Sequence, residues 1–130
     1  MRSNRTRAMR QLIVPGLSGA AAVVTMANAV LAADAARGQQ VFAACAACHS
    51  EHAGGIGPPL KGVVGRKSAA VESYRYSGPM RRANLIWDES NLREFISDPQ
   101  DKVPGNRMPF GGLHEQRDID DVIAFLKTQN

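Results

Sequence analysis

Two cysteines separated by two residues, with a histidine directly after the second, constrain this chain more than any other feature. They form Cys45-Ala46-Ala47-Cys48-His49, and they are the only two cysteines among the 130 residues. In this pattern both thiols project to one side of a helical turn and add to the vinyl groups of a porphyrin, while the histidine binds the iron. The pattern therefore predicts one covalently attached haem c, and a fold built around it.

Three other uses of the two cysteines stay open: a disulfide, a thioredoxin-like redox pair and half of a zinc site. A thioredoxin-like pair opens a helix in a chain that alternates strands and helices. Here Cys45 and Cys48 close a predicted helix, and no useful strand pattern appears. A zinc ion could recruit His52, but adjacent Cys48 and His49 are hard to place around one tetrahedral centre. Haem attachment is the favoured interpretation.

The N-terminal region has the properties of a secretory signal peptide. The charged residues ahead of position 34 are four arginines: Arg2, Arg5, Arg7 and Arg10. A long uncharged stretch rich in Ala and Val follows them and ends in small residues that suit signal peptidase. We expect a leader over residues 1–32 that is cleaved after Ala32, and one domain over residues 33–130 in the periplasm. An uncleaved membrane anchor is the alternative, because the stretch is long enough to span ~30 Å of hydrocarbon.

The excess positive charge of the chain lies in this leader. The sequence carries 16 Lys and Arg against 12 Asp and Glu, a net charge of +4. Because the four leader arginines account for the whole excess, the domain has as many basic as acidic side chains. A phosphate-binding surface needs a net positive field, so we expect no nucleic-acid partner.

Apolar residues at helical spacing predict three helices, over residues 34–47, 88–98 and 115–128. Asp88 is suited to cap the second helix, and Pro99 is expected to end it. Acidic residues near the start of the third helix complement its dipole.

Long irregular stretches separate these helices. Glycines and prolines interrupt every period over residues 50–73, and a second irregular stretch is expected over residues 99–113. Three short helices enclose little core for a domain of this size. The expected fold class is therefore all-α, a small fold of three main helices and long loops wrapped around one haem.

A haem iron has a second axial position, and two methionines of the domain compete for it. Met108 lies in a loop whose prolines and glycine fix the backbone on both sides, which suits a residue that presents its sulfur to iron. Met80 is followed by two arginines that favour solvent, and we expect it to be a partly buried loop residue. Ligation by His49 and Met108 would raise the reduction potential and leave no open position. That favours an electron carrier over an enzyme.

The residues around these ligands resemble class I cytochrome c, the soluble family that includes the mitochondrial carrier and its bacterial periplasmic relatives. The resemblance covers nearly the whole domain and includes Gly57-Pro58-Pro59-Leu60 and Gly62-Val63-Val64-Gly65-Arg66-Lys67. It implies that the Pro58 carbonyl accepts a hydrogen bond from the ring of His49. The donors that it assigns to the haem propionates are Arg66, Tyr76 and Trp87. Ordinary core packing is an equal alternative for the tryptophan.

The resemblance also implies that the first and last helices cross closely at Gly38, with Phe125 packed against the crossing. The sequence departs from mitochondrial members at Met80, Phe95 and Asn106, where they have an asparagine, a tyrosine and a threonine. Because that tyrosine touches the ligand sulfur, we expect the reduction potential to differ from theirs.

The expected function is that of a soluble, monomeric carrier that passes single electrons between periplasmic or membrane-bound redox proteins. Lys61, Lys102 and Arg107 are candidates for a charged ring that guides brief docking. Two alternatives stay open: an electron-transfer subunit anchored by an uncleaved leader, and a haem protein whose Met108 is displaced by peroxide or a gas. His52 and His114 are expected to take no part in iron binding.

Overall fold

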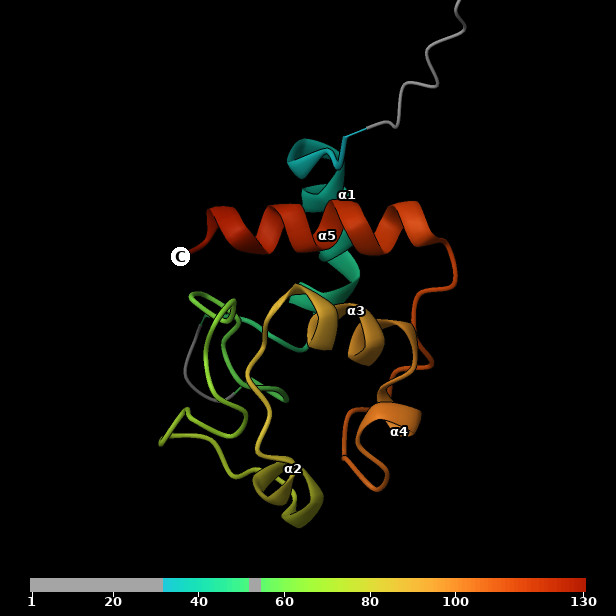
Figure 1. Cartoon of the computed structure of the whole chain (residues 1–130). Helices are drawn as coiled ribbons and strands as arrows, with labels where there is room; N and C mark the ends of the chain where they lie inside the picture. Colours follow the sequence, from blue (N-terminus) through green and yellow to red (C-terminus); the bar gives the residue numbers. More distant parts are fainter. Residues whose placement is uncertain (1–31, 52–54) are drawn as a thin grey trace, which may run out of the picture. The chain divides into compact units, whose positions relative to one another are not determined.

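The structure is a computed structural model that describes residues 32–51 and 55–130. These residues belong to one folded unit, Leu31–Asn130, and residues 1–31 of the predicted leader lie outside them. The described residues of this unit form five helices (Figure 1): α1 Ala35–Ala46, α2 Gly78–Ala83, α3 Glu89–Ser97, α4 Pro99–Lys102 and α5 Gln116–Thr128. The described residues form no strand beyond an isolated bridge between Lys67 and Ile86. The predicted all-α class is confirmed.

The three predicted helices are α1, α3 and α5, with ends within two residues of those expected. Asp34 caps α1, because its carboxylate accepts hydrogen bonds from two N–H groups of the first turn. Asp88 caps α3 in the same way, by accepting from the N–H of Asn91 at 2.8 Å. The cap residues therefore decide where these helices begin.

Two short helices were not predicted. Pro99 begins α4 instead of an irregular stretch, because the Asp98 carboxylate caps a new helix and proline suits its first turn. Met80 lies in α2 and not in a loop, since the Ser77 hydroxyl accepts a hydrogen bond from the Met80 N–H and Pro79 occupies the first turn. Helices this short leave no hydrophobic period to detect.

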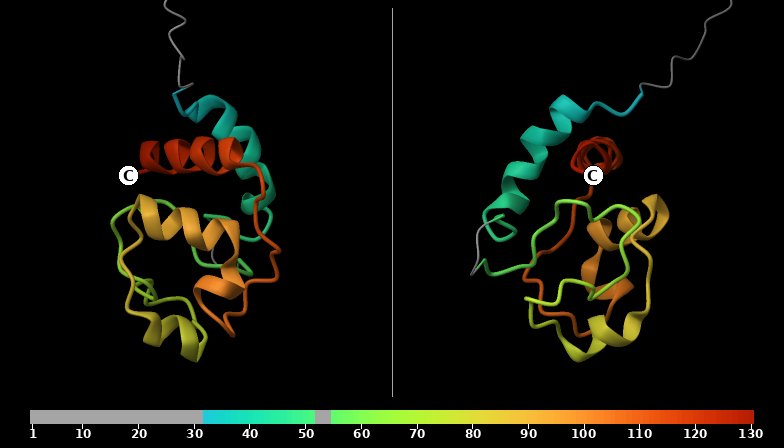
Figure 2. Two further views of the ribbon diagram at one scale, coloured as in Figure 1. Left: turned by 45° about the vertical axis from the view of Figure 1, so that its right-hand side comes forward. Right: turned by 90° about the vertical axis from the view of Figure 1, so that its left-hand side faces the viewer.

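α5 packs against both α1 and α3 (Figures 1 and 2). A Cβ added to Gly38 of α1 would lie 1.9 Å from the carbonyl oxygen of Asp121, so only glycine allows the two backbones to come so close. The rings of Phe42 and Phe125 pack beside this contact with centroids 5.1 Å apart. The predicted close crossing is confirmed.

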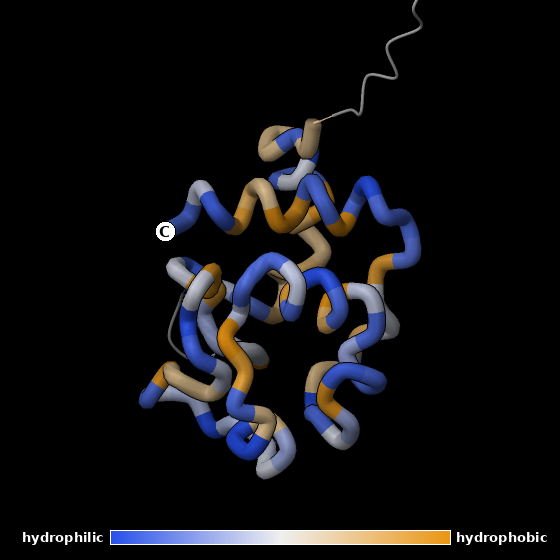
Figure 3. Tube along the Cα trace, in the orientation of Figure 1, coloured by the Kyte–Doolittle hydropathy of each residue, from blue (hydrophilic) through white to orange (hydrophobic). Residues whose placement is uncertain are grey.

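The buried core lies around α5 and α3 and is small. Among the described residues, six buried side chains form one contacting cluster: Val63, Trp87, Leu92, Ile119, Ile123 and Leu126. Val103 and Val122 are also buried. Hydrophobic and hydrophilic segments alternate along α5 in Figure 3, as expected for a helix with one buried face. Partly buried side chains of the loops and of α2 extend this core, so loops contribute much of the apolar packing.

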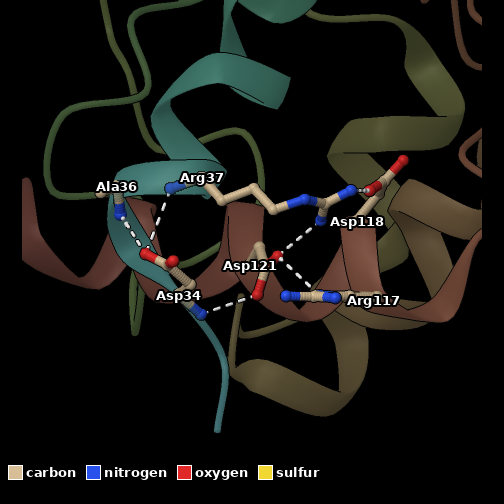
Figure 4. Close-up of polar contacts among 6 residues, drawn as sticks. All are labelled: Asp34, Ala36, Arg37, Arg117, Asp118 and Asp121. Atoms are coloured by element: carbon tan, nitrogen blue, oxygen red, sulfur yellow. Dashed lines mark hydrogen bonds and ion pairs between the residues drawn. The ribbon is translucent and has the colours of Figure 1, made fainter. Parts of the chain in front are cut away.

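A cluster of charged groups fastens the start of α1 to α5 (Figure 4). The Asp121 side chain, in a residue only 1% exposed, accepts a hydrogen bond from the main-chain N–H of Asp34 at 2.7 Å and one from the Arg37 guanidinium at 2.6 Å. Arg37 also pairs with Asp118, and Arg117 lies 3.8 Å from the Asp121 carboxylate. The Asp34 N–H, and then Arg37, lower the pKa of Asp121 from its ordinary value of 3.8.

We predict that Asp121→Asn makes the stability of the domain less dependent on pH under acidic conditions. Because folding lowers the pKa of Asp121, its contribution to stability is full above pH 3.8 and is lost as the pH falls below that value. The Tm followed by circular dichroism from about pH 6 to about pH 2 should fall less steeply in the variant. Asp120→Asn removes the ion pair with Arg93 and serves as the matched control. Equal slopes for Asp121→Asn and the unchanged protein would contradict the prediction.

Candidate haem site

The two cysteines lie at the C-terminal end of α1 and in the turn that follows it. The N–H groups of Cys48 and His49 both donate to the carbonyl oxygen of Cys45, at 3.1 and 2.9 Å. This turn brings the two thiols and the imidazole to one end of the helix. Both cysteines are free and half-buried, so the structure contradicts the disulfide alternative.

The environment of the thiols also differs from that of a redox-active pair. Burial raises the pKa of the Cys45 thiol, and the neighbouring Cys48 raises it further. A thioredoxin-like cysteine needs the opposite shift, because its nucleophile is the thiolate. In the part of the chain that the structure describes, no group of three His, Cys, Asp or Glu side chains is placed to hold a metal ion. His52, the ligand considered for zinc, lies outside that part.

The ring of His49 is held by the loop that follows the motif. Its Nδ1 lies 2.7 Å from the carbonyl oxygen of Pro58. Because a carbonyl only accepts hydrogen bonds, Nδ1 carries the ring proton, and Nε2 keeps the lone pair that binds a metal. A Cβ added to Gly57 would lie 2.6 to 3.1 Å from three ring atoms, so the glycine backbone packs directly on the imidazole. A fixed imidazole with Nε2 available, beside two free thiols, fits an attached haem.

Two side chains brace this loop through its main-chain carbonyls. The guanidinium of Arg66 donates to the carbonyl oxygens of Lys61 and Pro59, both at 2.9 Å. The hydroxyl of Tyr74 donates to the carbonyl oxygen of Ile56 at 2.9 Å. Sequence reasoning missed Tyr74, since nothing near it in the sequence marks the carbonyl that it would reach. These three hydrogen bonds help to keep the loop against the histidine ring.

The other two residues assigned to the propionates are placed in aromatic clusters. Burial raises the pKa of the Tyr76 phenol, and its ring meets Tyr74 edge-on with centroids 4.8 Å apart. Trp87 is 8% exposed and packs on Phe95 at 5.0 Å, so the core-packing role expected as an alternative is confirmed. Among the described residues, no hydrogen bond is recorded from its indole. Propionate binding by Arg66, Tyr76 and Trp87 stays a prediction.

Met108 lies in the loop between α4 and α5, and this loop is anchored from inside. Its N–H donates to Oδ1 of Asn106 at 2.8 Å. The amide nitrogen of Asn106 donates in turn to the carbonyl oxygens of Pro99 and Val103, at 2.6 and 2.9 Å. Gly105, with a φ of +80°, makes the turn just before it. The sequence marked Asn106 only as a departure from a family, and its anchoring role was missed.

Met80, the competing methionine, is held elsewhere. Its side chain packs against the hydrophobic core. The helix that carries it approaches the Met108 loop at Gly105, where an added Cβ would lie 3.3 Å from Pro79. The two methionines therefore lie on separate elements, and only Met108 lies in a loop held by a buried polar side chain.

Comparisons with known proteins point to one family. The family model described as "Cytochrome c" matches residues 35–130. "Cytochrome c-554" of Methylosinus trichosporium is 45% identical over 106 residues, which are 79% of this chain and 80% of that protein. "Cytochrome c2" of Blastochloris viridis is 40% identical over 125 residues, which are 94% of this chain and 95% of that protein. The solved structure of "cytochrome cH from Methylobacterium extorquens" has a TM-score of 0.70 and 44% identity, and covers 73% of this chain and 98% of its own.

We predict that Gly57→Ala disturbs the histidine ring and destabilises the haem-loaded protein. The added Cβ would lie 2.6 Å from Cε1 of His49, so the ring or the loop has to move, at a cost of about 1–3 kcal/mol. The Tm should therefore fall by about 4 °C or more, and the visible absorption spectrum should change. Gly111→Ala is the control, because an added Cβ there meets no atom within 4 Å. The prediction fails if both variants have the Tm and spectrum of the unchanged protein.

Proposed function

Because the chain belongs to the cytochrome c family, its cofactor is one covalently bound haem c, and we propose that it is a soluble carrier whose iron is bound by His49 and Met108. The haem iron supplies the one-electron chemistry when bound, by changing between Fe(III) and Fe(II). The observation that carries the proposal is the anchored Met108 loop, because a methionine held in place favours a closed, six-coordinate site. Electron transfer by a c-type haem is the general function of the family.

The roles proposed for the other residues follow from their positions. Cys45 and Cys48 would form the two thioether bonds from one end of α1. His49 would bind the iron through Nε2, since Nδ1 is engaged with Pro58. The remaining proposed contacts are those to the propionates, from Arg66, Tyr76 and Trp87.

The basic side chains separate into two groups. Those on α1, α3, α4 and α5 all form ion pairs with carboxylates: Arg37, Arg93, Lys102, Arg117 and Lys127. For the others, no ion pair is recorded among the described residues, and all lie between positions 61 and 107: Lys61, Arg66, Lys67, Arg75, Arg81, Arg82 and Arg107. Lys102, expected in the docking ring, is instead bound to Glu94 at 2.5 Å. We call the group without ion pairs the basic loop surface, to which α2 contributes Arg81 and Arg82, and propose that it docks acidic redox proteins.

The proposed ligand is tested by Met108→Ala, with Met80→Ala as the matched control. Loss of the thioether should remove the sulfur-to-iron charge-transfer band of the oxidised protein. It should also lower the reduction potential by roughly 0.1 V or more, within the ~0.8 V that axial ligands span. Met80→Ala should keep both. Absorption spectroscopy and redox titration measure the two effects. A charge-transfer band that is lost in Met80→Ala but kept in Met108→Ala would contradict the proposal and identify Met80 as the ligand. Tight peroxide or gas binding by the unchanged protein would favour the haem-enzyme alternative.

The basic loop surface is tested by electron-transfer kinetics with a small acidic redox protein. At low ionic strength, Arg82→Ala should slow the second-order rate about two- to tenfold, because steering by charge raises association rates. The difference should disappear as salt is added. Lys127→Ala removes the same charge from an ion pair with Glu89 on the helical side and should leave the rate unchanged. Equal rates for the two variants would contradict the assignment of the docking surface.

We also propose that residues 1–32 are a signal peptide cleaved after Ala32 and that the domain works in the periplasm. Within the described residues, no helix is long and apolar enough to cross a membrane. Ala32 and Ala33 are exposed and precede the cap residue Asp34, so cleavage between them leaves the start of α1 intact. N-terminal sequencing should find Ala33 as the first residue of the haem-loaded protein. A membrane-bound protein that keeps the leader would favour the anchored subunit instead.

A further inference from the structure

We propose that Asn106 is a positioning residue for the axial ligand: its buried amide holds the backbone of Met108 and so sets how readily Met108 is displaced from the iron. This inference rests on the proposed ligation by Met108. It concerns a residue of the Met108 loop, which carries neither the histidine nor the cysteines.

The amide group of Asn106 uses each of its polar atoms. Oδ1 accepts the hydrogen bond from the Met108 N–H at 2.8 Å. Nδ2 has two hydrogens, and it donates to the carbonyl oxygens of Pro99 and Val103 at 2.6 and 2.9 Å. The opposite orientation would place the NH₂ group against an N–H and the oxygen against two carbonyls. The three partners therefore fix the orientation of the amide.

These partners connect Met108 to a buried end of the fold. Pro99 and Val103 are themselves buried: Pro99 begins α4 and Val103 directly follows it. α4 follows α3 directly after the shared cap Asp98. The main chain of Asn106 is also bound to this part of the fold, because its N–H donates to the same Val103 carbonyl at 3.1 Å. The amide is thus the link between the helical part of the domain and the backbone of the proposed ligand.

Burial makes this link costly to break. Asn106 is 8% exposed, so a movement of Met108 that breaks the bond leaves a buried acceptor without its partner. Leaving a buried polar group unsatisfied costs more than losing an exposed hydrogen bond. A hydroxyl has a single O–H donor and serves only one of the two carbonyls. A threonine at this position should therefore hold Met108 less firmly than asparagine does.

The test uses the haem-loaded protein in its oxidised form and imidazole as a competing ligand. Asn106→Ala removes all three side-chain bonds, and we expect imidazole to bind about tenfold more tightly because Met108 leaves more easily. Asn106→Thr should give an intermediate affinity. Gln100→Ala is the matched control. The Gln100 side chain, on α4, donates to the Asn106 carbonyl and accepts from the Gly105 N–H. Its removal takes two hydrogen bonds from the same loop and leaves the bond between Asn106 and Met108 intact. The affinity of this variant for imidazole should not change.

A second readout follows the hydrogen bond itself. The Met108 amide hydrogen should exchange with solvent at least tenfold faster in Asn106→Ala than in Gln100→Ala, as measured by NMR. Where Asn106→Ala does not fold, Asn106→Thr gives the same comparison with an intermediate shift.

Two results would overturn the inference. One is a lower Tm in Asn106→Ala or Asn106→Thr with unchanged imidazole affinity and unchanged Met108 exchange, which would make Asn106 a general support of the fold. The other is equal tightening of imidazole binding in Gln100→Ala. Failure of the proposed ligation looks different, because Met108→Ala would then keep the charge-transfer band while the exchange experiment still reports on the Asn106 bond.

Discussion

The hydrogen bond between the His49 ring and the Pro58 carbonyl is the interaction on which the rest of the site depends. It assigns the ring proton to Nδ1 and leaves Nε2 as the ligand atom. The loop can hold that carbonyl in place only because its own backbone is held, by Gly57 packed on the ring and by Arg66 and Tyr74 bound to its carbonyls. A stretch that looks irregular in sequence is therefore the support of the proposed iron ligand.

The helices fix where this site begins. α1 is fastened near its start by the Asp121 cluster and crosses α5 at Gly38. Its other end carries Cys45, so these two contacts determine where the thiols emerge from the helical part of the domain. The apolar core is small, and a covalent haem adds a large apolar body to it. Attachment of the cofactor and folding of the domain are therefore expected to support each other.

Sequence reasoning succeeded where the signal is local or carried by a motif. Three helices follow from periodicity and caps, and the histidine to Pro58 bond follows from a resemblance. Sequence reasoning missed α2 and α4, which are too short to show a hydrophobic period. It also missed the anchoring role of Asn106, whose partners are carbonyl groups that every residue has. The ion pairs depend on the folded arrangement as well, since Lys127 and Glu89 are 38 residues apart.

The proposed docking surface, built from cations for which no ion pair is recorded among the described residues, implies that the domain is an electric dipole although its formal charges sum to zero. The interaction energy between an oriented dipole and a charged partner falls with the square of their distance, whereas the interaction energy between two charges falls with the first power of the distance. Screening with a length of about 8 Å at physiological salt shortens the range further. The field therefore acts mainly at close approach, where it exerts a torque that turns the molecule. Because the net charge is zero, copies of the domain do not repel one another at long range. The field of a charged partner selects the orientation in which the domain approaches that partner.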